Sequence, residues 1–216
     1  MFTEIILREQ IRQYKCTLEH SQIVSRRTEK KAVKNKCCDR VTYNTSTMNR
    51  LQKLYTLVFV RKNNQVLMGR KKRGFGLGQW NGFGGKIEKG ESFAEGAKRE
   101  LYEESSLIAK DLKHVGVVKY EVQDESLDQI VHVFTCNKYE GTEKPSDEMD
   151  PVKWFRYDCV PYDKMWPDAR TWWPSMLNDK YFSVHCVYNR GKIISTEVLE
   201  HDSIKEALNV FNFMVQ

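Results

Sequence analysis

Apolar and polar positions follow patterns typical of strands and helices mainly beyond residue 50. The run Leu54-Tyr-Thr-Leu-Val-Phe-Val60 is apolar enough for a buried strand, and Gln65-Val-Leu-Met68 predicts a second strand. Asn63-Asn64 between them is a turn sequence, so the two strands should form a hairpin. Further strands are expected over 115–122, 130–137 and 152–156, and a second hairpin over 181–199 with its turn at 189–191.

Two segments carry the pattern of a helix. Ser92-Phe-Ala-Glu95 is a capping box, in which Ser92 caps the first turn and Glu95 reaches back, so a helix should run to about Ser105. Over 203–215, apolar side chains recur at helical spacing, which predicts an amphipathic helix at the end of the chain. Strands interspersed with two or three helices indicate an α/β fold, or α+β by some schemes.

The net charge of +6 arises entirely from the first fifty residues. These contain eleven Lys and Arg against five Asp and Glu, whereas the remaining 166 residues contain 24 of each. Residues 26–36 are a basic run followed by a polar stretch, so we expect 1–48 to be a basic, disordered extension with a short helix near 4–19. Because the rest of the chain is neutral, no stable complex with nucleic acid is expected.

Composition limits the cellular compartments in which we expect the protein. No run approaches eighteen apolar residues, so we expect neither a membrane-spanning helix nor a membrane partner. The first residues form a poor secretory signal, and the six cysteines lack metal-ligand spacing, which favours free thiols in a reducing compartment. We therefore expect a cytoplasmic protein. The basic run leaves a nuclear or mitochondrial fraction open, although acidic residues interrupt any presequence.

Three glutamates on the predicted helix share one face. Glu100, Glu103 and Glu104 are spaced i, i+3 and i+4, so their carboxylates project within reach of one another. Neither Glu100 nor Glu104 has a basic residue three or four positions away, as a solvated acidic stripe usually has. Clustered hard oxygens beside a glycine-rich loop are what Mg²⁺ or Mn²⁺ requires. The pattern favours a metal site over a solvated acidic surface.

The spacing around these glutamates resembles the Nudix box. Gly85, Glu91, Arg99 and the three glutamates follow the pattern Gly-x5-Glu-x7-Arg-Glu-U-x-Glu-Glu-x-Gly-U, where U is a bulky aliphatic residue. Ser106 stands where the family has its second glycine. That position normally adopts a left-handed helix cap, which costs serine about 1 kcal/mol. The resemblance implies a Nudix-type α/β/α sandwich with a mixed central sheet over 49–200, and a terminal helix within 201–216 packed on it.

The resemblance also implies a Mg²⁺-dependent hydrolase of nucleoside diphosphates linked to another group, with Mn²⁺ as a substitute. The metal would bridge phosphate oxygens, and an activated water would attack phosphorus. By position in the motif, the expected catalytic residues are Glu100, Glu103, Glu104, Arg99 and Glu91. The groups expected at the metal are Glu100, Glu103, Glu104, Glu148 and the carbonyls of Gly84 and Gly85. Which glutamate acts as general base stays open.

Over about Leu54 to Leu199, the chain also resembles MutT-type Nudix hydrolases, which act on oxidised purine nucleoside triphosphates. This resemblance is carried by Leu54-Tyr-Thr-Leu-Val, Lys71-Lys-Arg-Gly-Phe-Gly, Trp80-Asn-Gly-Phe-Gly-Gly, Ser146-Asp-Glu-Met and Met165-Trp-Pro-Asp. It implies hydrolysis of 8-oxo-dGTP and 2-hydroxy-dATP to the monophosphate and pyrophosphate, which sanitises the nucleotide pool. The residues expected to bind this substrate are Thr56, Lys71, Phe75, Asn81, Tyr120, Gln129, Trp166 and Asp168.

The chemistry of these positions suits a purine, although each aromatic residue has an alternative role in the core. Trp166 offers a face for stacking, and an amide such as Asn81 both donates and accepts hydrogen bonds. By the resemblance, Asp168 is the first of two aspartates that read the opposite edge of the base. The second aspartate is Ala169 here, and a pocket methionine is Gln129. Because two adjacent carboxylates could both donate and accept, losing one predicts narrower or shifted base selectivity.

Two other functions stay open at this stage. One is a Nudix hydrolase of a dinucleoside polyphosphate, an mRNA cap or a nucleotide sugar, and the other is a non-catalytic nucleotide- or RNA-binding Nudix module. Asn81, Trp166 and Asp168 argue for a closed purine pocket. The intact Arg99 and glutamates argue for catalysis. We expect a monomer whose partner is a small-molecule nucleotide.

Overall fold

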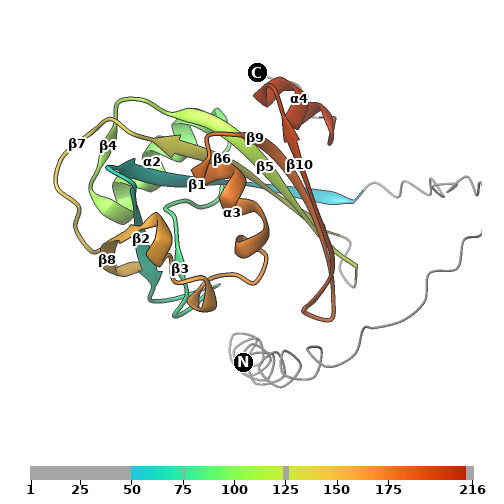
Figure 1. The fold of residues 1–216 in the computed structure, drawn as a ribbon, viewed down its shortest axis with the longest axis horizontal. Coiled ribbons are helices and arrows are strands. Elements are labelled where there is room, and N and C mark those ends of the chain that lie inside the picture. The colour runs from blue at the N-terminus through green and yellow to red at the C-terminus, as the bar shows by residue number, and fades with distance from the viewer. Residues whose placement is uncertain (1–49, 75, 124–126, 213–216) are drawn as a thin grey trace, which may run out of the picture. The chain divides into compact units, whose positions relative to one another are not determined.

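The computed structural model describes residues 50–74, 76–123 and 127–212 (Figure 1). The predicted extension 1–48, its short helix near 4–19, and the substrate-binding candidate Phe75 lie outside the described residues. The account below concerns the compact unit that contains Leu51–Asn189 and the chain from Ile193 onward.

The described chain contains the following elements. The strands are β1 (Leu51–Lys62), β2 (Gln65–Lys71), β3 (Trp80–Asn81), β4 (Ile108–Ala109), β5 (Lys113–Val122), β6 (Leu127–Cys136), β7 (Tyr139–Glu140), β8 (Met149–Arg156), β9 (Tyr181–Asn189) and β10 (Lys192–His201). The α-helices are α2 (Phe93–Ser105), α3 (Ala169–Leu177) and α4 (Ile204–Asn209). Short 3-10 turns follow β8 at Tyr157–Cys159 and Tyr162–Lys164.

Most strands join one mixed sheet in the order β10-β9-β5-β6-β1-β2-β3, with β8 paired to β2. The pairs β1/β6 and β5/β9 are parallel, whereas β1/β2, β2/β8 and β5/β6 are antiparallel. The predicted Asn63-Asn64 turn is confirmed, because β1 and β2 pair around it and both asparagines have positive φ. The short strands β4 and β7 form a separate two-stranded sheet.

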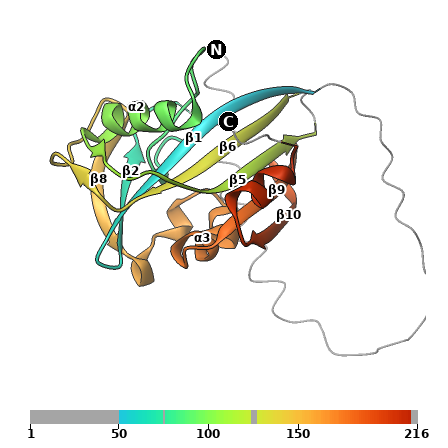
Figure 2. The ribbon, with the colours of Figure 1, turned by 90° about the horizontal axis from the view of Figure 1, so that it is seen from above.

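Helices cover both faces of this sheet, with α2 on one side and α3 on the other (Figure 2). Val58, Leu67 and Leu101 belong to the core between α2 and the sheet. Phe59 and Trp173 belong to the core on the α3 face, where their ring centroids lie 4.7 Å apart. The predicted mixed central sheet with helices on both faces is therefore confirmed.

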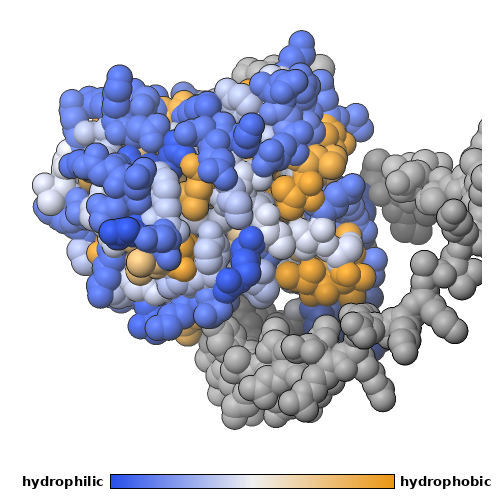
Figure 3. Space-filling model, in the orientation of Figure 1, coloured by the Kyte–Doolittle hydropathy of each residue, from blue (hydrophilic) through white to orange (hydrophobic). Residues whose placement is uncertain are grey.

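The surface is predominantly hydrophilic in the view of Figure 3, with separate small apolar patches. Exposed large apolar side chains include Leu77, Ile108, Ile194 and Leu199. Within the part of the chain that the structure describes, no helix has the length and apolar character needed to cross a membrane.

Helix α2 begins as the capping box predicts. The Ser92 hydroxyl accepts from the Glu95 backbone N–H at 3.3 Å, and the Glu95 carboxylate accepts from the Ser92 N–H at 2.8 Å. Ala97 and Leu101 then bury one side of the helix against the sheet. A cap of this kind contributes about 1 kcal/mol. The start of the helix, and so the direction of its glutamates, is set by local sequence.

Helix α2 ends at Ser106, which has φ 62° and ψ 16° and donates its N–H to the Tyr102 carbonyl. This is the left-handed cap that the motif leads one to expect at a glycine position. We predict that Ser106→Gly raises the free energy of unfolding by about 0.5–1 kcal/mol, because glycine adopts this conformation without strain. Urea denaturation would measure the gain. A loss of stability in the variant would contradict the prediction.

The structure corrects two expectations about helices. The helix at Ala169–Leu177 was not predicted, because two tryptophans and Pro174 obscure the helical periodicity there. Trp172 and Trp173 pack into the core on the α3 face of the sheet. The final helix, expected over 203–215, ends at Asn209 within the described residues. Asparagine is a weak helix former, and Asn212 has a positive φ, so the helix stops early. Leu208 of α4 is buried with Val117.

A pair of histidines lies in the layer between α2 and the sheet. The ring of His132 stacks on Phe93 at 3.7 Å, and that of His114 stacks on Phe134 at 4.5 Å. A hydrogen bond of 3.3 Å joins the two imidazoles. Burial lowers the pKa of His114 to about 4 and that of His132 to about 3. Both rings are therefore neutral in the folded protein near neutral pH.

This pair predicts a loss of stability on mild acidification. The unfolded histidines have pKa values near 6.5, so the unfolded chain takes up protons first as the pH falls. The stabilisation is complete above about pH 6.5, and we expect a loss of about 3 kcal/mol between pH 7 and pH 5. Urea denaturation at both pH values measures the loss. A histidine NMR titration is the control. Buried rings that titrate near pH 6.5 in the folded protein would contradict the prediction.

Candidate active site

The glycine-rich segment before α2 lies against β1. Thr56 donates its backbone N–H to the Gly85 carbonyl at 2.9 Å, and Val58 exchanges hydrogen bonds with Phe83 at 2.7 and 3.0 Å. Gly84 therefore lies directly over the backbone of Thr56, where a side chain would collide. Gly85 lies against the carboxylate of Glu100. The two glycines let the loop approach both β1 and the acidic face of α2.

Arg99 is the centre of the first group of site residues. Its guanidinium donates to both oxygens of Glu91, at 2.6 and 3.0 Å. It also donates to Glu100 at 2.9 Å, to Glu103 at 3.2 Å and to the carbonyl of Lys86 at 3.1 Å. Arg99 thus links the loop before the helix to two of the three glutamates on it. A planar guanidinium suits this role, because it offers several donors in fixed directions.

A second group of contacts holds Glu104. Its carboxylate is 3% exposed and accepts from the Gly84 N–H at 2.8 Å and from the Lys71 ammonium at 3.0 Å. Lys71 also donates to Glu148 at 2.9 Å, and Arg73 pairs with the other Glu148 oxygen at 3.0 Å. Lys71, expected to bind substrate, therefore lies among the carboxylates. Glu148 lies there too, although it is 44 residues from Glu104 in sequence.

The electrostatics divide these carboxylates into two classes. Hydrogen bonds from Arg99 hold the pKa of Glu91 at about 2, and those from Lys71 lower the pKa of Glu148. Burial raises the pKa of Glu100 and that of Glu104, because it disfavours the charged form despite the nearby cations. A further cation would therefore stabilise the ionised forms of Glu100 and Glu104 more than those of Glu91 and Glu148.

The donor chemistry of these residues fits a divalent cation. Among the described residues, no three Asp, Glu, His or Cys side chains already converge as a complete metal cage. Mg²⁺ in phosphate-processing sites commonly uses only one or two carboxylates, with waters and phosphate oxygens as its other ligands. Desolvated oxygens of Glu100 and Glu104 beside the Gly84–Gly85 loop match this donor chemistry.

Direct contacts join some of the residues expected to bind a purine. Tyr120 donates its hydroxyl to Asp168 at 2.7 Å, and Gln129 is the cross-strand neighbour of Tyr120. Trp166 is half-buried, and its indole lies over Gly76. These four residues belong to β5, β6 and the chain that leads into α3.

Two other candidates belong to different strands, β3 and β1. Asn81, at the end of β3, accepts from the Gly82 N–H at 2.9 Å through its side-chain oxygen. Thr56 is buried in β1, with its methyl group facing Gly96 of α2. None of the hydrogen bonds between described residues joins Asn81 or Thr56 to Asp168.

Sequence reasoning missed two residues beside Asp168. The indole N–H of Trp172 donates to Asp168 at 2.9 Å, and the hydroxyl of Tyr188 lies 3.4 Å from the other carboxylate oxygen. Trp172 could have been found from its i+4 spacing to Asp168, had the helix α3 been predicted. Nothing in the sequence connects Tyr188, which is on β9, with this carboxylate.

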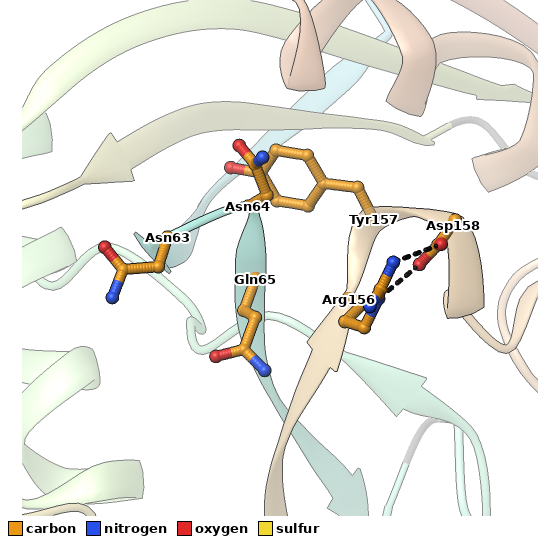
Figure 4. A pocket seen from close by; sticks show the side chains of 6 residues that line it. All are labelled: Asn63, Asn64, Gln65, Arg156, Tyr157 and Asp158. Carbon is orange, nitrogen blue, oxygen red and sulfur yellow. Dashed lines mark hydrogen bonds and ion pairs between the residues drawn. The ribbon is translucent and has the colours of Figure 1, made fainter.

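A surface depression lies elsewhere, at the turn between β1 and β2. Figure 4 shows its lining side chains, with Arg156 and Asp158 joined as an ion pair. The lining residues are Asn63, Asn64, Gln65, Arg156, Tyr157 and Asp158. It contains none of the predicted site residues, and its charged groups already pair with each other, so it offers no competing catalytic site.

Known proteins resemble this chain in both sequence and fold. An oxidized purine nucleoside triphosphate hydrolase of Mus musculus is 43% identical over 152 residues, which cover 70% of this chain and 97% of that protein. A protein of the same name from Danio rerio is 48% identical over 130 residues, covering 60% of this chain and 83% of the relative.

A solved structure, the MutT protein of Bacillus halodurans, superposes with a TM-score of 0.61 at 26% identity, over 68% of this chain and 97% of that one. The sequence profile of the NUDIX domain matches residues 52–176, which include the glycine loop, α2 and the strands that hold them. The chain with this Arg99-centred glutamate cluster therefore belongs to the Nudix family of hydrolases.

Proposed function

We propose that this Nudix hydrolase converts oxidised purine nucleoside triphosphates, of the 8-oxo-dGTP and 2-hydroxy-dATP class, to the monophosphate and pyrophosphate. The observation that carries the proposal is the complete set of contacts from Arg99 to Glu91, Glu100 and Glu103. Binding alone would not need three carboxylates held around one guanidinium. The names of the relatives from mouse and zebrafish support the substrate class.

The glutamates of α2 would bind Mg²⁺ and activate water. Glu100 and Glu104 are mostly buried, whereas Glu103 is more exposed. Glu148 and the carbonyls of Gly84 and Gly85 would be further ligands. A bound Mg²⁺, with Mn²⁺ as a substitute, would neutralise phosphate charge and increase the acidity of bound water. Arg99 and Glu91 would keep the glutamates in orientation throughout turnover.

Lys71 would act on the phosphates rather than on the base. Its ammonium already lies between Glu104 and Glu148, and its pKa is raised because the two carboxylates outweigh the effect of burial. It therefore stays charged near neutral pH. A triphosphate bound beside these carboxylates would bring anionic oxygens to a fixed cation, which lowers the cost of charge that builds during cleavage.

The purine would bind on the α3 side of the sheet. Trp166 and Phe75 would provide stacking surfaces, with Tyr120 and Gln129 on neighbouring strands and Thr56 towards the phosphates. Asn81 and Asp168 would read the two edges of the base by hydrogen bonds. Because Ala169 cannot supply a second carboxylate, we propose a base selectivity that is narrower than two aspartates would allow, or shifted.

The decisive test is pyrophosphate release from 8-oxo-dGTP and from dGTP at the same low concentration, with Mg²⁺ and after its removal by a chelator. The proposal expects faster release from the oxidised nucleotide and no release without a divalent ion. Equal rates for both nucleotides would overturn the substrate class. Release from dinucleoside polyphosphates or capped RNA instead would favour the other Nudix activities.

The setting of this reaction is also a proposal. We propose a cytoplasmic monomer that acts on free nucleotides, with a nuclear or mitochondrial fraction of the same protein. The three cysteines that the structure describes, Cys136, Cys159 and Cys186, are free thiols. Fractionation of cells and size-exclusion chromatography would test the compartment and the oligomeric state.

A further inference from the structure

Asp168 is a buried carboxylate surrounded by neutral hydrogen-bond donors. It is 1% exposed and lies at the start of α3. Tyr120 of β5 donates to Oδ2 at 2.7 Å, and Trp172 of α3 donates to the same oxygen at 2.9 Å. Tyr188 of β9 lies 3.4 Å from Oδ1. Three elements of the fold thus converge on a single side chain.

These donors favour the ionised form of the carboxylate. An indole N–H can only donate, and it shares Oδ2 with the hydroxyl of Tyr120. A proton on Oδ2 would therefore break both bonds. Hydrogen bonds to a charged acceptor are roughly twice as strong as neutral ones, and they offset the cost of burying the charge.

The other titratable groups near Asp168 do not change this conclusion. The raised pKa values of Tyr120 and Tyr188 come first from burial and then from the charge of Asp168, so both phenols stay protonated and able to donate. Cys186 of β9 is also close, and burial raises the pKa of its thiol. None of the ion pairs found among the described residues involves Asp168, so no cation takes up its acceptor capacity.

One oxygen of Asp168 still has unused hydrogen-bonding capacity. Oδ2 carries two short hydrogen bonds, whereas the contact of Oδ1 with Tyr188 is long for an O–H···O bond. A carboxylate oxygen accepts about two hydrogen bonds. Oδ1 can thus accept from an N–H of a base while Oδ2 anchors the side chain.

We infer that Tyr120, Tyr188 and Trp172 are positioning residues that hold Asp168 as an obligate hydrogen-bond acceptor, so that the enzyme selects purines with an N–H at position 1. The inference rests on the proposed function and specifies its selectivity. With Ala169 as the next residue, no neighbouring acid can donate in place of Asp168. Tyr120, expected among the substrate-binding residues, would thereby act through its hydroxyl on Asp168.

The inference predicts which purines are accepted. 8-Oxoguanine carries N–H groups at position 1 and on the 2-amino group, and both can donate to Oδ1. O6-methylguanine has a lone pair at position 1, which would face the lone pairs of the carboxylate. A buried polar group left without a hydrogen-bond partner in this way typically lowers binding affinity at least about tenfold.

The test measures equilibrium binding of 8-oxo-dGMP and O6-methyl-dGMP, so it does not depend on hydrolysis. Calorimetry should give at least about tenfold tighter binding of 8-oxo-dGMP at pH 7.5. In Tyr120→Phe and in the Tyr120→Phe/Tyr188→Phe double variant, the ratio should fall several-fold. Tyr162→Phe is the matched control, because the Tyr162 ring packs on Trp173 and Tyr162 is not among the hydrogen-bond donors to the Asp168 carboxylate. The steric effect of the O6-methyl group is the same in every variant, so it does not contribute to the change in the binding ratio between variants.

Asp168→Asn separates recognition of the base from a purely structural role. Asparagine can turn its NH2 group towards position 1 of the purine and donate a hydrogen bond. The variant should therefore bind O6-methyl-dGMP better relative to 8-oxo-dGMP, whereas a carboxylate that only supports the fold would leave this ratio unchanged.

The outcomes distinguish this inference from the proposed function. An unchanged binding ratio in folded Tyr→Phe variants would overturn the inference, even if the melting temperature falls. Equal binding of the two monophosphates by the unmodified protein would also overturn it. Selective binding of 8-oxo-dGMP without release of pyrophosphate from 8-oxo-dGTP would overturn the proposed function and leave the positioning of Asp168 supported.

Discussion

Glu100→Gln is expected to lower kcat for pyrophosphate release by about a thousandfold, within the range for losing a residue that activates the nucleophile or holds the metal. Glu100 donates no hydrogen bond of its own and lies between Arg99, at 2.9 Å, and the glycine loop. Glutamine has nearly the same shape but no charge. The variant therefore loses an anionic ligand without leaving a cavity.

The same substitution should leave the fold intact. Burial raises the pKa of Glu100, which means that its charge is not favoured by its surroundings in the absence of metal. We expect the free energy of unfolding without metal to change by less than about 1 kcal/mol. Glu197→Gln on the exposed face of β10 is the matched control and should retain full activity. A Glu100→Gln enzyme with kcat within threefold of the unmodified protein would exclude Glu100 from the catalytic set.

Gly84→Ala is expected to lower the free energy of unfolding by about 4 kcal/mol or more, the range in which single substitutions are exceptional. A methyl group at Gly84 would overlap the carbonyl of Thr56, and this neighbour is backbone of a central strand rather than a flexible side chain. Relief would require the loop to move off β1, which breaks the bond between the Thr56 N–H and the Gly85 carbonyl. Urea denaturation and the yield of soluble protein would measure the effect.

The neighbouring substitution Gly85→Ala provides the matched comparison. A methyl group there would lie 2.5–2.7 Å from the carboxylate of Glu100, which is a side chain and can move. We therefore expect a smaller loss of stability than in Gly84→Ala, together with a loss of activity similar to that of Glu100→Gln. If Gly84→Ala were as stable as the unmodified protein, the close approach of the loop to β1 would be incorrect.

Local sequence was sufficient for the features that depend on residues close along the chain. The capping box at Ser92, the left-handed cap at Ser106 and the shared face of the three glutamates all arise within one or two turns of α2. The β1–β2 hairpin likewise follows from apolar runs on either side of Asn63-Asn64. Short-range geometry is the same in most folds, so these patterns can be interpreted without knowledge of the rest of the molecule.

Helix α3 and the length of α4 were not predictable in this way. Residues Ala169–Leu177 contain a proline and adjacent tryptophans, and their helical form depends on burial of Trp172 and Trp173 against the sheet. In α4, the apolar positions extend beyond Asn209, but the backbone leaves the helix there. Tertiary packing outweighs helical propensity in the first case, and local backbone preference outweighs periodicity in the second.

The sequence by itself determined the family, the helix α2 and the identity of the acidic cluster, because that motif is contiguous. Only the tertiary structure decided which charged side chains contact this acidic cluster. Lys71 reaches Glu104 across 33 residues and Glu148 across 77. It also decided that Tyr120 and Tyr188, on separate strands, share Asp168 with Trp172. Such contacts depend on strand order and register, which pair residues far apart in the chain and leave no periodic trace in the sequence.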